Sequence, residues 1–215
     1  MTSPPPRIPP HPPNVHPVPS DGRRHVGPLE TIVHRHWPTG TVPPRTLIAA
    51  VDRLASLPAH LTGRLLEGLT AFYIGMGAVT DYPPFADLTG QPIDPARPEG
   101  PQWQHIPAGY RDRQIVIGSG SHSLSIDVTL HEIFHAMDDL DGWISSSPDF
   151  RALHWSCSPV LADDRYVRQR AEFFAEAGAV VTLRAWDVLE AMLSGHTHRA
   201  YAVRSWFSRE YGVGR

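Results

Sequence analysis

A stretch with helical periodicity runs from residue 126 to residue 140. Its apolar residues return every three or four positions, as on one face of a helix. They are Ile126, Leu130, Ile133, Phe134, Met137 and Leu140. Ser123 or Ser125 is a candidate N-cap. The sequence therefore predicts an amphipathic, mostly buried helix in this stretch.

A second helical pattern covers residues 170–181. Phe174, Ala177 and Val181 form one stripe, and Glu172 and Glu176 form another. A pair of glutamates spaced four apart usually faces solvent, but the neighbours of this pair are apolar. Carboxylates in such surroundings are costly unless they bind a metal or accept hydrogen bonds.

The rest of the chain alternates helical and strand patterns. Residues 81–109 are rich in Pro and Gly and predict a long connection with short strands around 103–106. The pattern predicts helices over 46–57, 61–69, 185–193 and 199–211, and strands over 71–76 and 113–117. These elements indicate an α+β fold, a small mixed sheet packed on helices.

Two local expectations follow from the strand patterns. The strand at 113–117 is expected at the edge of the sheet beside a cleft, where an edge can bind peptide backbone. His34, Arg35 and His36 fall in a short ambiguous segment and are expected to be solvated.

The first helix carries residues that suit metal-dependent hydrolysis. His131 and His135 are four residues apart, so both imidazoles lie on one helix face and can bind a single Zn²⁺. Glu132, beside the first histidine, can then act as general base towards a zinc-bound water, which attacks a polarised carbonyl. The spacing predicts a zinc hydrolase site, with a surface helix as the less favoured alternative.

A third ligand has to come from elsewhere in the chain, because such sites use three protein ligands and an open position. Glu172 is the best candidate, and Glu176 would orient His131 or His135; the opposite assignment stays open. Asp139 lies four residues after His135 and could accept its free N–H, unless it belongs to a solvated acidic helix end.

The two ligand segments carry a family resemblance. His131-Glu132-Ile133-Phe134-His135-Ala136-Met137-Asp138-Asp139-Leu140, followed by Glu172-Phe173-Phe174-Ala175-Glu176, resembles the zinc peptidase domain of anthrax toxin lethal factor and its relatives, which include the Pro-Pro endopeptidases. The resemblance implies a zincin-like metallopeptidase fold, with zinc ligands His131, His135 and Glu172. It also implies Glu132 as general base and peptide-bond hydrolysis as the reaction.

One position departs from the family pattern. The family has a tyrosine about seven residues before the glutamate ligand, where its hydroxyl stabilises the oxyanion. Here position 165 is arginine, and Tyr166 lies one residue out of register. Tyr166 is therefore a candidate catalytic residue, with ordinary packing as the alternative.

Composition limits the other possibilities. Nine of the 23 prolines lie in residues 1–20, so residues 1–25 are expected to form a disordered leader and residues 26–215 the metallopeptidase domain. All 19 basic residues are arginines, which leaves no lysine for a phosphate-binding loop, and a net charge of -3 argues against a nucleic-acid partner. The single cysteine, Cys157, is expected in the core.

No apolar run suits a signal peptide or a membrane span. We therefore expect no membrane partner, and either a cytoplasmic location or export without a cleaved signal. The preferred function is a zinc-dependent endopeptidase acting on peptides or proteins. The alternatives are a zinc amidase for a small peptide or amide metabolite, and a metal-free interaction protein on the same scaffold.

Overall fold

The computed structural model describes residues 7–120 and 125–215. It divides into two compact units, Met1–Leu124 and Ser125–Arg215, which are considered separately. Residues 1–6 of the expected leader and the candidate cap Ser123 lie outside the described residues. None of the helices in the described part of the chain is long and apolar enough to cross a membrane.

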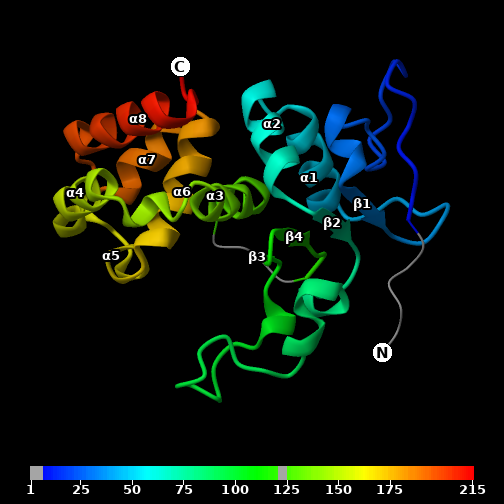
Figure 1. The fold of residues 1–215 in the computed structure, drawn as a ribbon, viewed down its shortest axis with the longest axis horizontal. Helices are drawn as coiled ribbons and strands as arrows, with labels where there is room; N and C mark the ends of the chain where they lie inside the picture. Colours follow the sequence, from blue (N-terminus) through cyan, green and yellow to red (C-terminus); the bar gives the residue numbers. More distant parts are fainter. Residues whose placement is uncertain (1–6, 121–124) are drawn as a thin grey trace. The chain divides into compact units, whose positions relative to one another are not determined.

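The first unit contains a four-stranded mixed sheet and two helices (Figure 1). The strand order is β1-β2-β4-β3; β1, β2 and β4 are parallel, and β3 runs antiparallel to β4. The elements are β1 (Val33–His36), α1 (Arg45–Ala55), α2 (Ala59–Gly68), β2 (Ala71–Gly75), β3 (Ala108–Arg111) and β4 (Gln114–Ile117). The predicted helices and the mixed sheet of an α+β fold are therefore present.

The strand predicted at 113–117 is β4, but its expected place at the sheet edge is wrong. It lies between β2 and β3 and, like other interior strands, it is apolar on both faces, since Ile115, Val116 and Ile117 are all buried. The edge strand on this side of the sheet is β3. The residues expected to be extended around 103–106 include a 3₁₀ turn, Trp103–His105. Strand propensity missed β3 because Ala and Gly at its start are poor strand formers.

Part of the proline-rich leader contacts the sheet. The Ile8 amide donates a hydrogen bond of 2.7 Å to the Arg35 carbonyl, Arg7 forms an antiparallel bridge with His36, and Ile8 is buried. These contacts arise because the edge of β1 offers unpaired backbone groups. From residue 7 onward the segment therefore makes contacts that the sequence analysis did not expect, while the domain boundary after residue 25 stays a prediction.

A buried arginine connects this segment to β1. The Arg35 guanidinium donates to both oxygens of Glu30, at 2.7 and 2.8 Å, and to the carbonyls of Gly22 and Arg24, at 3.2 and 2.8 Å. Arg35 is 0% exposed and His36 is 8% exposed, so the expectation that they are solvated is wrong. A carboxylate five residues earlier in the chain makes the buried charge tolerable.

The second unit is helical. The elements are α3 (Val128–Leu140), α4 (Pro148–Cys157), α5 (Asp164–Arg168), α6 (Arg170–Thr182), α7 (Trp186–Met192) and α8 (Thr197–Tyr211). The two helices that carry the candidate ligands and the two C-terminal helices match the prediction, and Cys157 is buried as expected. Helices α4 and α5 were not predicted, although Ser147 followed by Pro148 is a common helix start and the Ser147 hydroxyl accepts from the Phe150 amide.

Helix α3 begins later than its apolar pattern suggested. Its N-cap is Asp127, whose Oδ1 accepts a hydrogen bond of 3.0 Å from the Leu130 amide. Ile126 precedes the helix and is 40% exposed, so it does not belong to the buried stripe. Ser125 is therefore not the cap; an aspartate directly before the first turn also suits the helix dipole.

An aromatic cluster holds α3 against α6 and α8. The ribbons of α3 and α6 lie side by side in Figure 1. The Phe134 ring makes edge-to-face contacts with Phe174, Phe207 and Tyr211, with ring centroids 5.5–6.0 Å apart. Each such pair adds about 0.5–1.5 kcal/mol beyond its buried area. This cluster fixes the distance between the two helices that carry the candidate ligands.

Gly178 on α6 allows the close approach of Phe134. A Cβ added at Gly178 would lie 2.5 Å from two atoms of the Phe134 ring. Gly178→Ala should therefore destabilise the protein by about 1–3 kcal/mol, because alanine overpacks the contact between α3 and α6. Urea denaturation of the variant measures this change.

A matched glycine lies in an open part of a helix. A Cβ at Gly63, in α2, would meet nothing within 4 Å. Gly63→Ala should raise stability by up to about 1 kcal/mol, because alanine favours the helix. If Gly178→Ala were stabilising to the same degree, the proposed close contact would be wrong.

Candidate metal centre

Helix α3 brings the two histidines of the motif together. His131 and His135 are one turn apart, and their Nε2 atoms are 3.1 Å from each other. His131 is buried and His135 is half-buried, so both rings lie largely out of water. The spacing of four residues therefore produces the pair of nitrogen donors that the sequence predicted.

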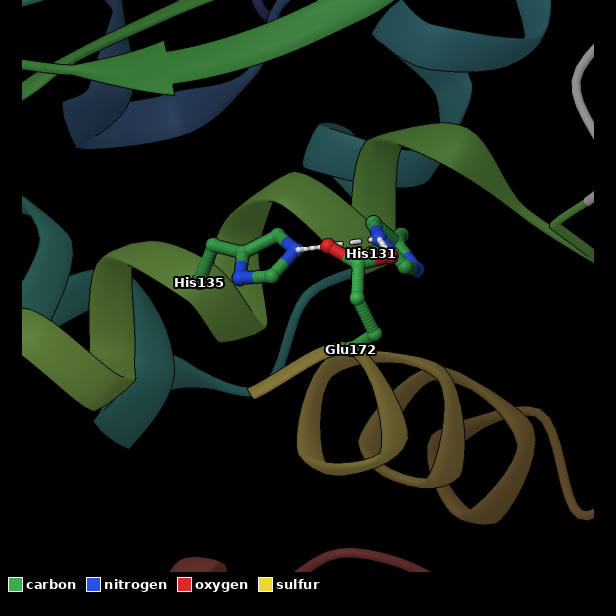
Figure 2. Close-up of side chains that lie close together, drawn as sticks. All are labelled: His131, His135 and Glu172. Carbon is green, nitrogen blue, oxygen red and sulfur yellow. Dashed lines mark hydrogen bonds and ion pairs between the residues drawn. The ribbon is translucent and has the colours of Figure 1, made fainter. Parts of the chain in front are cut away.

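Helix α6 supplies a carboxylate to the same point. Glu172 Oε1 lies 3.2 Å from His135 Nε2, and Glu172 Oε2 lies 3.6 Å from His131 Nε2. In Figure 2 the Glu172 side chain extends from its helix to the two imidazoles. Within the described residues, His131, His135 and Glu172 are the group whose donor atoms, all within 4.8 Å of one another, could hold a metal ion.

These distances suit a tetrahedral ion. A Zn²⁺ ion with ligands at about 2.0–2.1 Å separates its ligand atoms by about 3.3 Å. The two Nε2 atoms are 3.1 Å apart, and each has a Glu172 oxygen nearby, Oε1 at 3.2 Å from His135 and Oε2 at 3.6 Å from His131. With one donor atom taken from each residue, all three atoms lie within 4.8 Å of one another. Two imidazoles and a carboxylate are also a common donor set for zinc, so the residues present fit the ion.

Glu176 contacts the opposite nitrogen of His131. Its Oε2 lies 2.9 Å from His131 Nδ1, and its Oε1 accepts a 2.9 Å hydrogen bond from the Ile126 amide. A carboxylate can only accept at Nδ1, so Nδ1 carries a proton and Nε2 faces Glu172. This arrangement corresponds to Glu172 as ligand and Glu176 as orienting residue; both roles stay predictions.

The acidic surroundings change the titration of these groups. Burial alone would lower the pKa of His131, but hydrogen bonds with Glu172 and Glu176 outweigh it and raise the pKa to about 10. Burial would raise the pKa of Glu172, yet hydrogen bonds with His131 and His135 bring it well below the ordinary value. Without a metal, the site therefore keeps a proton that a divalent cation would displace.

Glu132 adjoins His131 on α3 and is not one of the three candidate ligands. It is 8% exposed, and its negative charge helps to raise the pKa of His131. A buried carboxylate beside the ligand group is in a suitable place for a general base. That role stays a prediction.

Tyr166, on α5, is buried and paired with its neighbour. Its ring packs near Phe173, and Arg165 Nη2 donates a 2.7 Å hydrogen bond to its hydroxyl oxygen. Burial and the charge of Glu176 outweigh the effect of Arg165 and raise the pKa of Tyr166 to about 12. The phenol thus stays protonated at neutral pH, and it interacts electrostatically with Glu176 of the candidate centre.

Asp138 is a residue of this region that sequence reasoning missed. It is 1% exposed, and its carboxylate accepts bonds of 2.6 Å from both the amide and the hydroxyl of Ser145. Arg170 Nε donates to the Ser145 carbonyl at 2.5 Å, so Ser145 joins the end of α3 to the start of α6. The sequence does indicate that Asp138 is buried, because it lies four residues after Phe134 and so on the apolar stripe of the helix. The role of Asp139 towards His135 stays a prediction.

The fold and the site together define an α+β protein with a candidate metal centre on two packed helices. Among solved structures, the chain is similar to the Pro-Pro endopeptidase PPEP-2 from Paenibacillus alvei, with a TM-score of 0.66 and 22% sequence identity. The match covers 83% of this chain and 99% of that one, and it establishes a shared fold. No family model matches the sequence, and no curated protein matches it.

Proposed function

We propose that the chain is a zinc-dependent endopeptidase with a zincin-like, lethal factor-like site. The observation that carries the proposal is the convergence of His131, His135 and Glu172 from two helices, with one donor atom of each residue within 4.8 Å of the others. The fold shared with a Pro-Pro endopeptidase supports peptide or protein substrates. Neither observation favours a zinc amidase or a metal-free interaction protein.

The proposed chemistry divides among a few side chains. A zinc ion held by His131, His135 and Glu172 would supply a water of lowered pKa and polarise the scissile carbonyl. Glu132 would take the proton from the attacking water and pass it to the leaving amine. Glu176 would keep His131 in the tautomer that leaves Nε2 for the ligand position.

The experiment that tests the proposal compares the wild type with Glu172→Ala. We expect one zinc per chain in the wild type after reconstitution, and weak or absent zinc in the variant, because one of three ligands is missing. The zinc-loaded wild type is then incubated with a library of extended peptides that includes Pro-Pro bonds.

The outcomes separate the three functions. Zinc binding with cleavage of many extended peptides supports an endopeptidase. Zinc binding with cleavage of small amides alone favours the amidase. A wild type that takes up no zinc would leave the interaction protein as the better description.

Tyr166 gives a prediction about the reaction. Tyr166→Phe should lower kcat by about 100-fold, because a hydroxyl that stabilises the oxyanion is lost. Zinc content should not change, since the hydroxyl is not a ligand. Steady-state kinetics and metal analysis of the same preparation check both statements, and an unchanged kcat would remove Tyr166 from the mechanism.

A further inference from the structure

The arginine next to Tyr166 has an unusual set of contacts. The Arg165 guanidinium carbon lies 4.7 Å from the centre of the Tyr166 ring, and its Nη2 donates to the phenol oxygen at 2.7 Å. Its Nε is buried and has no hydrogen-bond partner among the described residues; the Asp163 carboxylate, at 3.9 Å, is too far for a hydrogen bond. The side chain is thus held against the phenol and not in a salt bridge at hydrogen-bond distance.

These contacts determine the direction of the phenol proton. A guanidinium has donors and no acceptor, so the Tyr166 oxygen must accept from Arg165. The hydroxyl proton therefore points elsewhere, and within the described residues the bond from Arg165 is the one hydrogen bond of this hydroxyl. The proton remains available for an acceptor that residues 7–120 and 125–215 do not provide.

The pair lies on α5, which packs against α6, the helix that carries Glu172 and Glu176. The charge of Glu172 acts on Arg165, and the charge of Glu176 acts on Tyr166. Both glutamates belong to the group on α6 that contacts the histidines. A phenol donor polarised by a guanidinium at this location suits an oxygen that gains negative charge during reaction.

We propose that Arg165 is a positioning residue that makes Tyr166 a hydrogen-bond donor to the substrate oxyanion. The inference rests on the proposed peptidase function and adds a residue to it. The guanidinium donates to the phenol oxygen, so the phenol proton points away from Arg165. The charged hydrogen bond also makes the phenol hydroxyl a stronger donor. Arg165 acts through Tyr166 and does not itself contact the reacting atoms.

The test is a double-mutant cycle on the zinc-loaded, full-length protein, with an internally quenched peptide that the wild type cleaves. Arg165→Gln should lower kcat by about 10- to 100-fold, the usual effect of losing a charged hydrogen bond, with KM and zinc content unchanged. In the Tyr166→Phe background the same change should lower kcat by less than about twofold, because the donor it serves is gone.

Two further variants act as controls. Arg165→Lys keeps the charge but replaces the planar guanidinium with one ammonium group, so its kcat should lie between those of the wild type and Arg165→Gln. Arg168 lies on the same short helix and is exposed, paired with Asp164. Arg168→Gln removes the same charge from α5 and should leave kcat unchanged.

A second measurement does not depend on activity. Tyrosine labelled with ¹³C at Cζ gives six signals in metal-free protein, and Tyr166→Phe identifies the one from Tyr166. Arg165→Gln should move that signal, whereas Arg168→Gln should not. A Tyr166 signal that does not respond to Arg165→Gln means that the contact is absent and overturns the inference.

The kinetic outcomes are equally decisive. Equal kcat values for Arg165→Gln and Arg168→Gln, or losses that add in the double variant, overturn the inference and leave the proposed function intact. If the zinc-loaded wild type cleaves no peptide, the proposed function fails and the catalytic role of the pair fails with it.

Discussion

Glu132→Gln should lower peptide hydrolysis by about 100- to 10,000-fold while the protein keeps its zinc. Glutamine has the same shape but cannot take a proton from the attacking water. Glu132 is buried beside His131 and is not one of the three convergent donors, so zinc binding should survive. Steady-state kinetics with a cleaved peptide and metal analysis of the same sample check the two parts.

The contrast with Glu172→Ala makes this prediction specific. That variant should lose zinc and activity together, whereas Glu132→Gln should lose activity alone. A Glu132→Gln protein whose kcat stays within about threefold of the wild type would show that another group is the base.

Glu30→Gln should destabilise the first unit by about 3–5 kcal/mol, the largest effect on stability that we expect. The change leaves the Arg35 guanidinium, 0% exposed, without its charged partner. Thermal and urea denaturation followed by circular dichroism measure the loss. Asp52→Asn, which breaks the exposed pair with Arg24, should cost less than about 1 kcal/mol.

A double variant separates a buried charge from a structural distortion. Glu30→Leu with Arg35→Met should be more stable than Glu30→Gln, because neither charge is then buried alone. A double variant that is less stable than either single one would show that the hydrogen bonds to Gly22 and Arg24 matter more than the ion pair.

The same pair gives a pH dependence. Burial would raise the pKa of Glu30, but the hydrogen bonds from Arg35 and Val26 bring it below its ordinary value of 4.5. The folded-state pKa is therefore the lower one, and the stabilisation is complete above about pH 4.5 and is lost as the pH falls through the lowered pKa. Stability curves of wild type and Glu30→Gln should accordingly converge in acid.

The sequence predicted the two helices of the candidate ligands well because their signals are local. Apolar residues at helical spacing surround both the histidine pair and Glu172, so periodicity locates the helices and spacing locates the donors. The approach of Glu172 to both Nε2 atoms depends on tertiary packing. It depends on Gly178 and Phe134, a contact that no pattern along the chain reveals.

The wrong or missing predictions for Arg35, β4 and Asp138 also result from contacts between residues that are not neighbours in the sequence. Arg35 was expected in solvent because arginine is seldom buried, and its burial depends on Glu30 and on carbonyls of a proline-rich segment. The position of β4 inside the sheet depends on pairing with β3, whose Ala-Gly start has low strand propensity. Asp138 was overlooked because its partner, Ser145, lies in a turn beyond the helix.

The arrangement of the three donors also matters for a chain with one cysteine. His131 and His135 precede α4 and α5, and Glu172 follows them, so an ion bound by all three would close the intervening chain into a loop. Cys157, buried within that loop, has no second cysteine with which to form an intrachain disulfide. The ion would therefore cross-link the chain in addition to its proposed part in hydrolysis. Its removal would lower the stability of α4 and α5 together with that of the site.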